Sequence, residues 1–418
     1  MKQYKIKDLK LAGVGKKKIY WAWKHMPVLG AIGEEFEKEK PFKGLTIGVS
    51  LHVTKETAVL VQTFHKGGAL VALCGCNPLS TQDDVAAALA DEGFNVFAWR
   101  GQNHNQYYAC INAVLDFEPD ITIDDGCDLI SFLHLKRRQL LPKIRGGCEE
   151  TVMGVNRLRA MEKEGILRYP VISVNDACTK HLFDNRYGTG QSSLDGILRS
   201  TNILFAGKKV VVVGYGWCGR GVATRARGLG SQVIVCEVDP IKALESVMDG
   251  FTVMSIAEAS KVGDIFITVT SNAAVISYDH IMTMKEGAIL ANAGHMDMEI
   301  DVATLKKKAK KATEIRPNTL EYLLANGRKI YLLGEGRIIN LVGAEGHPSE
   351  VMDMSFSTQA LSTQYIANHY KQMQPRVYNT TIEQDQRIAS LKLKSMGITI
   401  DELTAEQKKY LSSWKEGT

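Results

Sequence analysis

The sequence predicts an α/β protein with two doubly wound domains, followed by a helical C-terminal tail. Strand-like and helix-like segments alternate from residue 45 to about residue 130, and a second alternating series begins near residue 208. The 418 residues are too many for one ordinary core, and the contents of 45% hydrophobic and 23% charged residues are typical of a globular protein.

The first series predicts a complete α/β domain before residue 130. Residues 44–50 and 69–73 read as buried parallel strands, and residues 95–99 and 121–123 continue the sheet. Helices are predicted at residues 57–67 and 81–91. Such alternation places the carboxyl ends of the strands at one edge of the sheet, where ligands bind in open α/β folds.

A glycine-rich turn opens the second series, directly after the strand-like residues 210–213. Gly214 permits the tight turn, Gly216 lets the backbone approach a pyrophosphate, and Gly219 lets the following helix pack closely on the strand. The start of that helix offers free N–H groups to anionic phosphates. Together these features predict a dinucleotide site.

An acidic residue identifies the dinucleotide. Glu237 ends the next strand-like segment, 18 residues after Gly219. A carboxylate at this point accepts hydrogen bonds from the adenosine ribose and repels a 2′-phosphate, so we expect NAD rather than NADP. Residues 264–270 and 287–290 read as further strands of the same domain.

Composition excludes several functions. The net charge of +5 is small for this length, and the basic run 306–311 is best explained as a solvated helix face, so we expect no nucleic-acid partner. We expect no membrane partner, because no uncharged apolar run is long enough to span a bilayer. The polar N-terminal residues lack the core of a signal peptide, and the eight cysteines have neither zinc nor CxxC spacing, which predicts a cytoplasmic protein without a metal.

Polar residues follow the predicted strands. His52 and Asp125 come after residues 45–50 and 121–123, although each alone could be a capping or turn residue. Lys180 and Asp184 have i,i+4 spacing, which fits either a surface ion pair or a lysine and carboxylate set beside a sugar hydroxyl at the domain junction. His295 follows a strand of the NAD domain, where nicotinamide chemistry usually occurs.

The end of the chain defines the domain organisation. Residues 351–370 read as a helix with no accompanying strand, and we expect this helix to return to the first domain and so form a cleft with two hinge crossings. The predicted substrate domain comprises residues 1–185 and 348–378, and the predicted NAD-binding Rossmann domain comprises residues 186–347. Residues 379–418 are predicted to be a helical tail that docks on another subunit or caps the chain.

Ordered motifs extend over essentially the whole chain: they are His52-Val53-Thr54-Lys55-Glu56-Thr57-Ala58, Asn77-Pro78-Leu79-Ser80-Thr81-Gln82-Asp83-Asp84, Asp124-Asp125-Gly126, Glu149-Glu150-Thr151, Asn175-Asp176 with Thr179-Lys180, Phe183-Asp184-Asn185-Arg186-Tyr187-Gly188, Asn292-Ala293-Gly294-His295 and Gly346-His347-Pro348-Ser349. Together these motifs resemble those of the S-adenosylhomocysteine hydrolase family. The resemblance implies reversible hydrolysis of S-adenosyl-L-homocysteine to adenosine and L-homocysteine. In this family bound NAD oxidises the ribose 3′-hydroxyl, C4′ loses a proton, homocysteine leaves by elimination, water adds at C5′, and the ketone is reduced again.

The same resemblance implies the roles of individual residues. Lys180 and Asp184 would serve hydroxyl deprotonation and C4′ proton transfer, His52 and Asp125 would act at C5′, and His295 would flank the sugar. Substrate contacts are implied for Thr54, Glu56, Glu150, Thr151, Asn185 and His347, and NAD contacts for Thr151, Gly214, Gly216, Gly219, Glu237, Asn272 and Asn340. A catalytic lysine needs a lowered pKa, which we expect desolvation in a closed cleft to supply.

The base pocket resembles that of the adenosyl-type members. A Glu56 carboxylate accepts a hydrogen bond from the N6 amino group and repels the O6 of hypoxanthine, so we expect the adenosyl substrate. Hydrolysis of S-inosyl-L-homocysteine is the alternative, since some relatives are thought to prefer it and Glu56 could instead face solvent on the following helix.

The chain also departs from the family pattern. Val152 and Met153 replace two threonines that contact NAD, Met296 replaces a gate phenylalanine, and Thr189 replaces a frequent cysteine. The tail lacks the lysine and tyrosine that reach a neighbouring subunit's NAD in many relatives, although we still expect a homotetramer or other homo-oligomer. A 2-hydroxyacid dehydrogenase is disfavoured because no carboxylate-binding arginine follows the late strand, and a non-catalytic NAD-binding regulator is disfavoured by the intact set of site residues.

Overall fold

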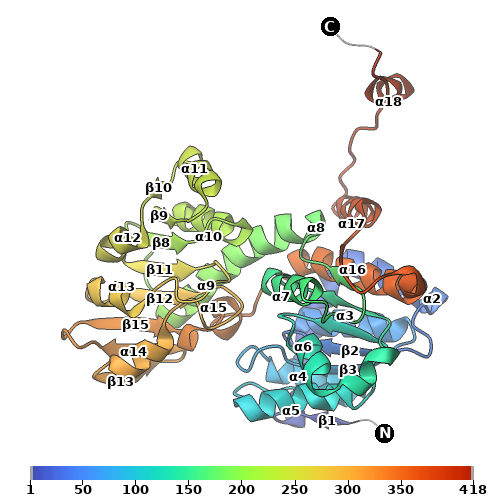
Figure 1. Cartoon of the computed structure of the whole chain (residues 1–418), viewed down its shortest axis with the longest axis horizontal. Coiled ribbons are helices and arrows are strands. Elements are labelled where there is room, and N and C mark those ends of the chain that lie inside the picture. Colours follow the sequence, from blue (N-terminus) through green and yellow to red (C-terminus); the bar gives the residue numbers. More distant parts are fainter. Residues whose placement is uncertain (1–2, 416–418) are drawn as a thin grey trace.

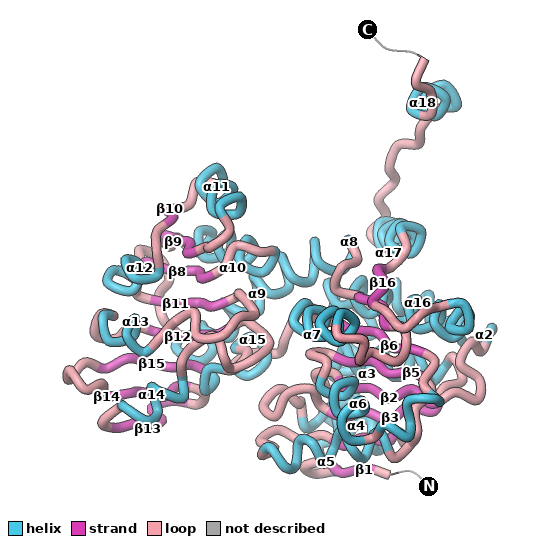
Figure 2. Tube along the Cα trace, viewed as in Figure 1, coloured by secondary structure: helices cyan, strands magenta, loops and turns pink. Residues whose placement is uncertain are grey.

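The computed structural model describes residues 3–415 and has two lobes, each built on its own twisted sheet (Figures 1 and 2). The chain crosses between the lobes twice, once on the way into the second sheet and once on the way back. This arrangement confirms the predicted fold class of two doubly wound α/β domains.

The first sheet is parallel throughout. Its strands, in spatial order, are β1 (Tyr4–Lys5), β4 (Asn95–Phe97), β3 (Leu70–Cys74), β2 (Thr46–Ser50), β5 (Ile121–Asp124), β6 (Gly146–Glu149), β7 (Val171–Ser173) and β16 (Val377–Asn379). The central strands are apolar on both faces because helices cover both faces, as parallel sheets require. The order reverses direction at β2, so the carboxyl ends of β2 and β5 form the point where a ligand is expected.

The helices of this lobe build its core against the sheet. They are α1 (Ala12–Lys24), α2 (Pro27–Glu39), α3 (Lys55–Lys66), α4 (Asp83–Glu92), α5 (His104–Leu115), α6 (Asp128–Lys136), α7 (Val152–Lys163), α8 (Cys178–Lys180), α16 (Ser349–His369) and α17 (Ile382–Ser395), with the 3₁₀ turns η1 (Leu9–Leu11), η2 (Arg138–Lys143) and η5 (Tyr370–Gln372). One core cluster joins α2, α3 and α16 to the sheet, and a second lies under α5 and α6.

The second sheet is a Rossmann sheet with an antiparallel extension. Its strands, in spatial order, are β10 (Thr252–Val253), β9 (Gln232–Cys236), β8 (Lys209–Val213), β11 (Ile265–Thr268), β12 (Ile289–Asn292), β15 (Lys329–Leu333), β14 (Thr319–Leu323) and β13 (Lys311–Arg316). The β13–β14 and β14–β15 pairs are antiparallel, and the other neighbouring pairs, including β12–β15, are parallel. Its helices are α9 (Thr189–Thr201), α10 (Trp217–Gly228), α11 (Pro240–Met248), α12 (Ile256–Val262), α13 (Tyr278–Thr283), α14 (Val302–Lys308) and α15 (Ile339–Val342), with the 3₁₀ turn η4 (Gly334–Gly336).

The returning segment differs in one respect from its prediction. Helix α16 packs on α2 and α3 of the first lobe, as expected for the segment after residue 350. However, the chain then adds β16, which pairs in parallel with β7 from Val377↔Val171 to Asn379↔Ser173, so the expectation of a helix without a strand is wrong. A three-residue edge strand has too few residues to show a period in the sequence.

The end of the chain divides into two parts. Helix α17 packs on α16 and α2, and the carboxylate of Asp385 accepts hydrogen bonds from the backbone N–H groups of Cys178 and Thr179 (2.7 and 2.9 Å). Helix α18 (Ala405–Leu411) instead projects away from both lobes (Figure 1). Among the described residues, no helix is long and apolar enough to cross a bilayer.

Candidate active site

A cavity lies between the two lobes and collects most of the predicted site residues. Its walls include His52, Thr54, Glu56, Asp125, Glu150, Thr151, Lys180, Asp184, Asn185, His295, Asn340 and His347. Strand ends and helix starts of the first lobe supply the residues up to Thr151, whereas the second lobe and the hinge segments supply the others. The cavity therefore joins the carboxyl ends of both sheets, where open α/β folds bind ligands.

Lys180 and Asp184 form a buried pair at the first hinge. Helix α8 ends at Lys180 and continues as a π-helix, η3 (His181–Gly188), whose wider turn places successive polar side chains on one side. Nζ of Lys180 lies 3.2 Å from Oδ1 of Asp184 and 2.7 Å from Oδ1 of Asn185. Both members of the pair are less than 5% exposed, at 4% and 3%, so the pair does not lie on the surface.

The charges around Lys180 correct one expectation. Burial lowers the pKa of Lys180, but the carboxylates of Asp184 and Glu150 outweigh burial, and the net pKa is raised above its ordinary value. The expected lowering by desolvation is therefore not found in this arrangement. Burial raises the pKa of Asp184, but Lys180 and His347 (Nδ1 3.2 Å from Oδ1) lower it by more. The net pKa therefore lies below its ordinary value, and the carboxylate is ionised.

Glu150 completes this group from the end of β6. Ser355 Oγ donates to its Oε1 (2.5 Å) and Gln359 Nε2 donates to its Oε2 (2.7 Å), both from α16. Burial, with the nearby Asp184 and against Lys180, raises the pKa of Glu150 to about 8. A carboxyl with this pKa exchanges its proton near neutral pH, so it can donate in one state and accept in the other.

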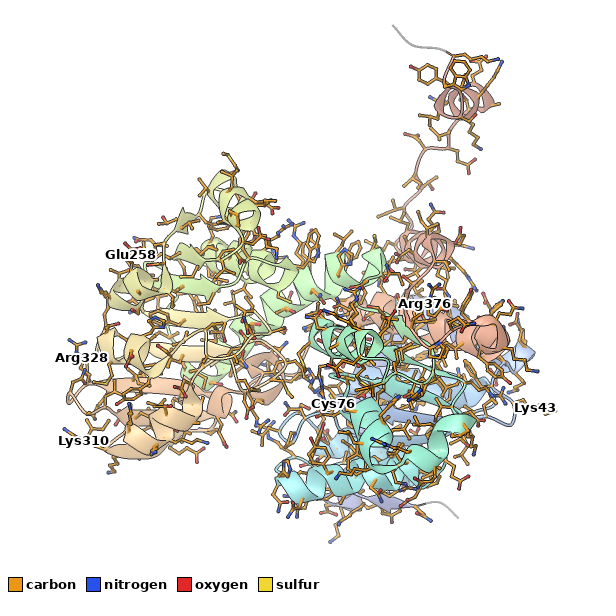
Figure 3. The ribbon with its side chains drawn as sticks, in the orientation of Figure 1. Lys43, Cys76, Glu258, Lys310, Arg328 and Arg376 are labelled. Carbon is orange, nitrogen blue, oxygen red and sulfur yellow. The ribbon has the colours of Figure 1, made fainter. Side chains whose placement is uncertain are left out.

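A second group lies at the ends of β2 and β5. Oδ2 of Asp125 is 3.4 Å from Nε2 of His52, and Oδ1 of Asp125 is 3.4 Å from Nδ1 of His295 in the other lobe. Ser80 Oγ lies 2.7 Å from Nδ1 of His52 and orients its ring. Burial lowers the pKa of His52 to about 4, against the opposing effect of Asp125, so this imidazole is neutral near pH 7. Cys76, labelled in Figure 3 on the side of the first lobe facing the second, donates from Sγ to Oδ2 of Asp125 (3.6 Å).

The start of α3 forms another end of the cavity. The side chain of Thr54 caps this helix and accepts a hydrogen bond from the N–H of Thr57. Glu56 is 1% exposed and lines the cavity, so the alternative of a solvent-facing Glu56 is wrong. Its Oε1 accepts a hydrogen bond from Ser349 Oγ (2.5 Å) at the start of α16.

The glycine turn has the geometry that a dinucleotide requires. Gly214 has a φ of +106°, which an L side chain rarely adopts. A Cβ on Gly219 would lie 2.0 Å from the carbonyl oxygen of Gly214, whereas a Cβ on Gly216 would point into open space, where a pyrophosphate can approach. Glu237 is held beside this turn because its Oε2 accepts a hydrogen bond from the N–H of Tyr215 (2.6 Å).

The two predicted asparagines lie in different surroundings. Asn340 is buried at the cavity, and its Oδ1 has no hydrogen-bond partner among the described residues, which leaves an acceptor for a ligand amide. Asn272 is exposed, is absent from the cavity wall, and accepts with its side chain from the N–H of Ala273 (2.8 Å). The glycine turn, Glu237 and Asn340 together fit NAD.

Sequence reasoning missed several supporting residues. Ser355 and Gln359 donate hydrogen bonds to Glu150, which lies more than 200 residues earlier in the chain. Ser349 likewise donates to the distant Glu56. Glu149 was also missed: its Oε1 accepts from the N–H groups of Gly126 (2.7 Å) and Thr151 (3.2 Å) and so ties two site loops together. The polar residues of α16 could be recognised as supporting residues only once it was known which part of the first lobe the helix packs against.

Comparison with known proteins gives one family for both lobes. Residues 185–346 match the profile described as S-adenosyl-L-homocysteine hydrolase, NAD binding domain, and residues 3–140 match S-adenosyl-L-homocysteine hydrolase. The chain is 62% identical over 415 residues to the S-inosyl-L-homocysteine hydrolase of Methanocaldococcus jannaschii, covering 99% of this chain and 100% of that protein. It is 60% identical over 416 residues to the adenosylhomocysteinase of Saccharolobus solfataricus, with the same coverage of 99% and 100%.

A third relative is also named for the inosyl substrate. The S-inosyl-L-homocysteine hydrolase of Methanococcus maripaludis is 57% identical over 413 residues, covering 99% of both chains. The names thus differ in the base of the substrate, whereas the matches extend over the whole length. The chain belongs to the S-adenosyl-L-homocysteine hydrolase family, and it is an NAD-dependent hydrolase of a homocysteine thioether.

Proposed function

We propose that this chain reversibly hydrolyses S-adenosyl-L-homocysteine to adenosine and L-homocysteine. The observation that carries the choice of base is the buried carboxyl of Glu56 in the cavity wall. An ionised carboxylate accepts a hydrogen bond from the N6 amino group of adenine and repels the O6 acceptor of hypoxanthine. A buried polar group that meets the wrong partner discriminates strongly, because the unpaired group keeps its full desolvation cost.

The hinge group suits the ribose of this substrate. Lys180, Asp184 and Glu150 present an ammonium, an ionised carboxylate and a carboxyl of raised pKa within one buried cluster. Such a cluster can hold the ribose hydroxyls. Lys180 can accept the 3′-hydroxyl proton once it has passed its own proton to a neighbouring carboxylate.

NAD fits the second lobe through the glycine turn, Glu237 and Asn340. Bound there, it would supply oxidation of the 3′-hydroxyl and the later reversal, so that no net redox change occurs. Gly214, Gly216 and Gly219 would hold the pyrophosphate, and Glu237 the adenosine ribose. Asp125 of one lobe contacts His295 of the other and so holds the two lobes together at the cavity.

The second polar group suits chemistry at C5′. His52 is neutral near pH 7 and is oriented by Ser80, so its Nε2 can accept a proton from water or, after protonation, pass one to a leaving thiolate. Asp125 lies between His52 and His295 and can stabilise the charged imidazole in either case. These roles require both lobes to be closed.

The test is a parallel assay of the adenosyl and inosyl thioethers with purified protein, with and without added NAD. Release of homocysteine from the adenosyl compound, without accumulation of reduced nicotinamide, is the expected result. Faster release from the inosyl compound would keep the redox-neutral hydrolase but overturn the assignment of the base. Failure to release homocysteine from either compound, with NAD bound, would identify a non-catalytic NAD-binding protein.

A further inference from the structure

We infer that Lys55 determines the base specificity of the cavity by keeping the neighbouring Glu56 carboxylate ionised. This inference rests on the proposed function, in which Glu56 reads the base. Nζ of Lys55 lies 3.2 Å from Oε1 of Glu56, and the two side chains are only 10% and 2% exposed. A buried charge that lacked this partner would be costly and would be neutralised by uptake of a proton.

The contacts of Glu56 leave one oxygen for the ligand. The hydrogen bond from Ser349 Oγ (2.5 Å) and the shortest contact with Lys55 (3.2 Å) both involve Oε1. Among residues 3–415, no protein group donates a hydrogen bond to Oε2, and Glu56 lines the cavity. Oε2 is thus the oxygen available to an exocyclic group of the base.

The protonation state of this oxygen decides which base it accepts. An ionised carboxylate only accepts hydrogen bonds and therefore pairs with the N6 amino group, a donor. A protonated carboxyl carries an O–H that donates to O6 of hypoxanthine. Lys55 therefore selects between adenine and hypoxanthine without touching either base. It is a positioning residue that acts through Glu56.

Lys55 is shared with a second carboxylate. Its Nζ lies 3.2 Å from Oε2 of Glu345, in the segment where the chain leaves the NAD-binding lobe, and Oε1 of Glu345 lies 3.3 Å from Nη1 of Arg199. Despite partial burial, Lys55 and Arg199 lower the pKa of Glu345. Lys55 thus contacts both carboxylates, and Arg199 places a second positive charge beside Glu345. The other charged or titratable groups facing this region are Lys18, His347 and Glu350, which line the adjoining groove.

The experiment compares the holoenzyme with Lys55→Met, which removes the charge but keeps the length of the side chain. The ratio of kcat/KM for the adenosyl and inosyl thioethers, and the ratio of affinities for adenosine and inosine by calorimetry, are measured from about pH 6 to about pH 9. Loss of the neighbouring positive charge favours a neutral carboxyl over a carboxylate at Glu56. We therefore expect the adenosine preference to fall about tenfold or more near pH 6 and to recover as the pH rises.

Matched variants separate charge from packing. Lys66→Met removes a lysine at the other end of α3 and should leave both ratios unchanged. Lys55→Arg keeps the charge and should keep the preference. Glu56→Gln carries both a donor and an acceptor and should bring both ratios near one at every pH, which tests the charge argument even if Lys55→Met does not fold.

The possible outcomes distinguish a failure of the Lys55 inference from a failure of the proposed function. An adenosyl preference that Lys55→Met leaves unchanged at every pH overturns the inference but not the proposed function. An inosyl preference of the unsubstituted enzyme overturns both the base assignment and the inference. If neither thioether is hydrolysed but adenosine binding responds to Lys55→Met as expected, the hydrolase proposal fails and the inference stands.

Discussion

Nζ of Lys180 lies 3.2 Å from Oδ1 of Asp184, and this ion pair is buried at the hinge where the chain leaves the first lobe. The pair has i,i+4 spacing, but only Asp184 lies in the π-helix η3, which begins directly after Lys180 at the end of α8. The geometry couples chemistry to stability, because removing either partner takes away the opposite charge beside a buried ionised group.

Lys180→Met should therefore impair both turnover and folding. We expect loss of the near-ultraviolet absorbance of reduced nicotinamide that normally follows substrate addition, and a decrease of about 3 kcal/mol in the free energy of unfolding. Urea denaturation measures the second effect. Lys242→Met, which breaks the exposed Lys242–Asp239 pair (3.6 Å), serves as the control and should leave the stability nearly unchanged, because solvent screens an exposed pair. Equal stability of the two variants would contradict the buried-pair argument.

His52 should make the protein sensitive to mild acid. Burial lowers its pKa from the ordinary value of 6.5 to about 4. Between these two pH values the unfolded chain binds a proton at this residue and the folded protein does not. This contribution to stability is complete above pH 6.5 and is lost as the pH falls toward 4, amounting to about 3 kcal/mol. His52→Asn removes the titration, so its urea midpoint should fall less than that of the unsubstituted protein between pH 7 and pH 5. Parallel curves would show that other groups cause the acid sensitivity.

Gly154 should not tolerate a methyl group. A Cβ at this position of α7 would lie 2.1 Å from Oε1 of Glu149, the atom that holds the N–H groups of Gly126 and Thr151. Gly154→Ala is expected to cost about 1 to 3 kcal/mol of stability and to reduce kcat/KM, because both site loops move. Gly13→Ala in α1, where a Cβ meets nothing within 4 Å, should instead be neutral or stabilising. Thermal melting of both variants decides the matter.

The projecting end of the chain should support self-association. Leu403, Tyr410, Leu411 and Trp414 are between 50% and 88% exposed on a segment that leaves its own lobes (Figure 1). Apolar surface of this kind usually marks an interaction site. We expect the chain to be a homo-oligomer and deletion of residues 398–418 to reduce its mass in light scattering. Lys408→Glu with Lys409→Glu, which leaves the apolar side chains in place, is the control, and an unchanged mass after deletion would exclude this role.

Much of the fold could be predicted because its signals are local. The glycine turn and Glu237 lie within one strand–helix–strand unit, so the neighbouring residues alone impose their geometry. Strand β16 could not be predicted, since three residues at a sheet edge show no period and depend on β7, two hundred residues earlier, for their hydrogen bonds.

The candidate site divides in the same way. Residue types and spacing alone determined that Lys180 and Asp184 are neighbours, that His52 and Asp125 stand at strand ends, and that a glycine turn with the geometry for a dinucleotide follows β8. Only the tertiary structure decided the ionisation of these groups. Burial sets the pKa of His52, the carboxylates of Asp184 and Glu150 reverse the effect of burial on Lys180, and α16 brings Ser349 to Glu56. The reason is physical: a proton's free energy depends on every charge and every solvent-excluding group around it, and these come from segments far apart in the chain.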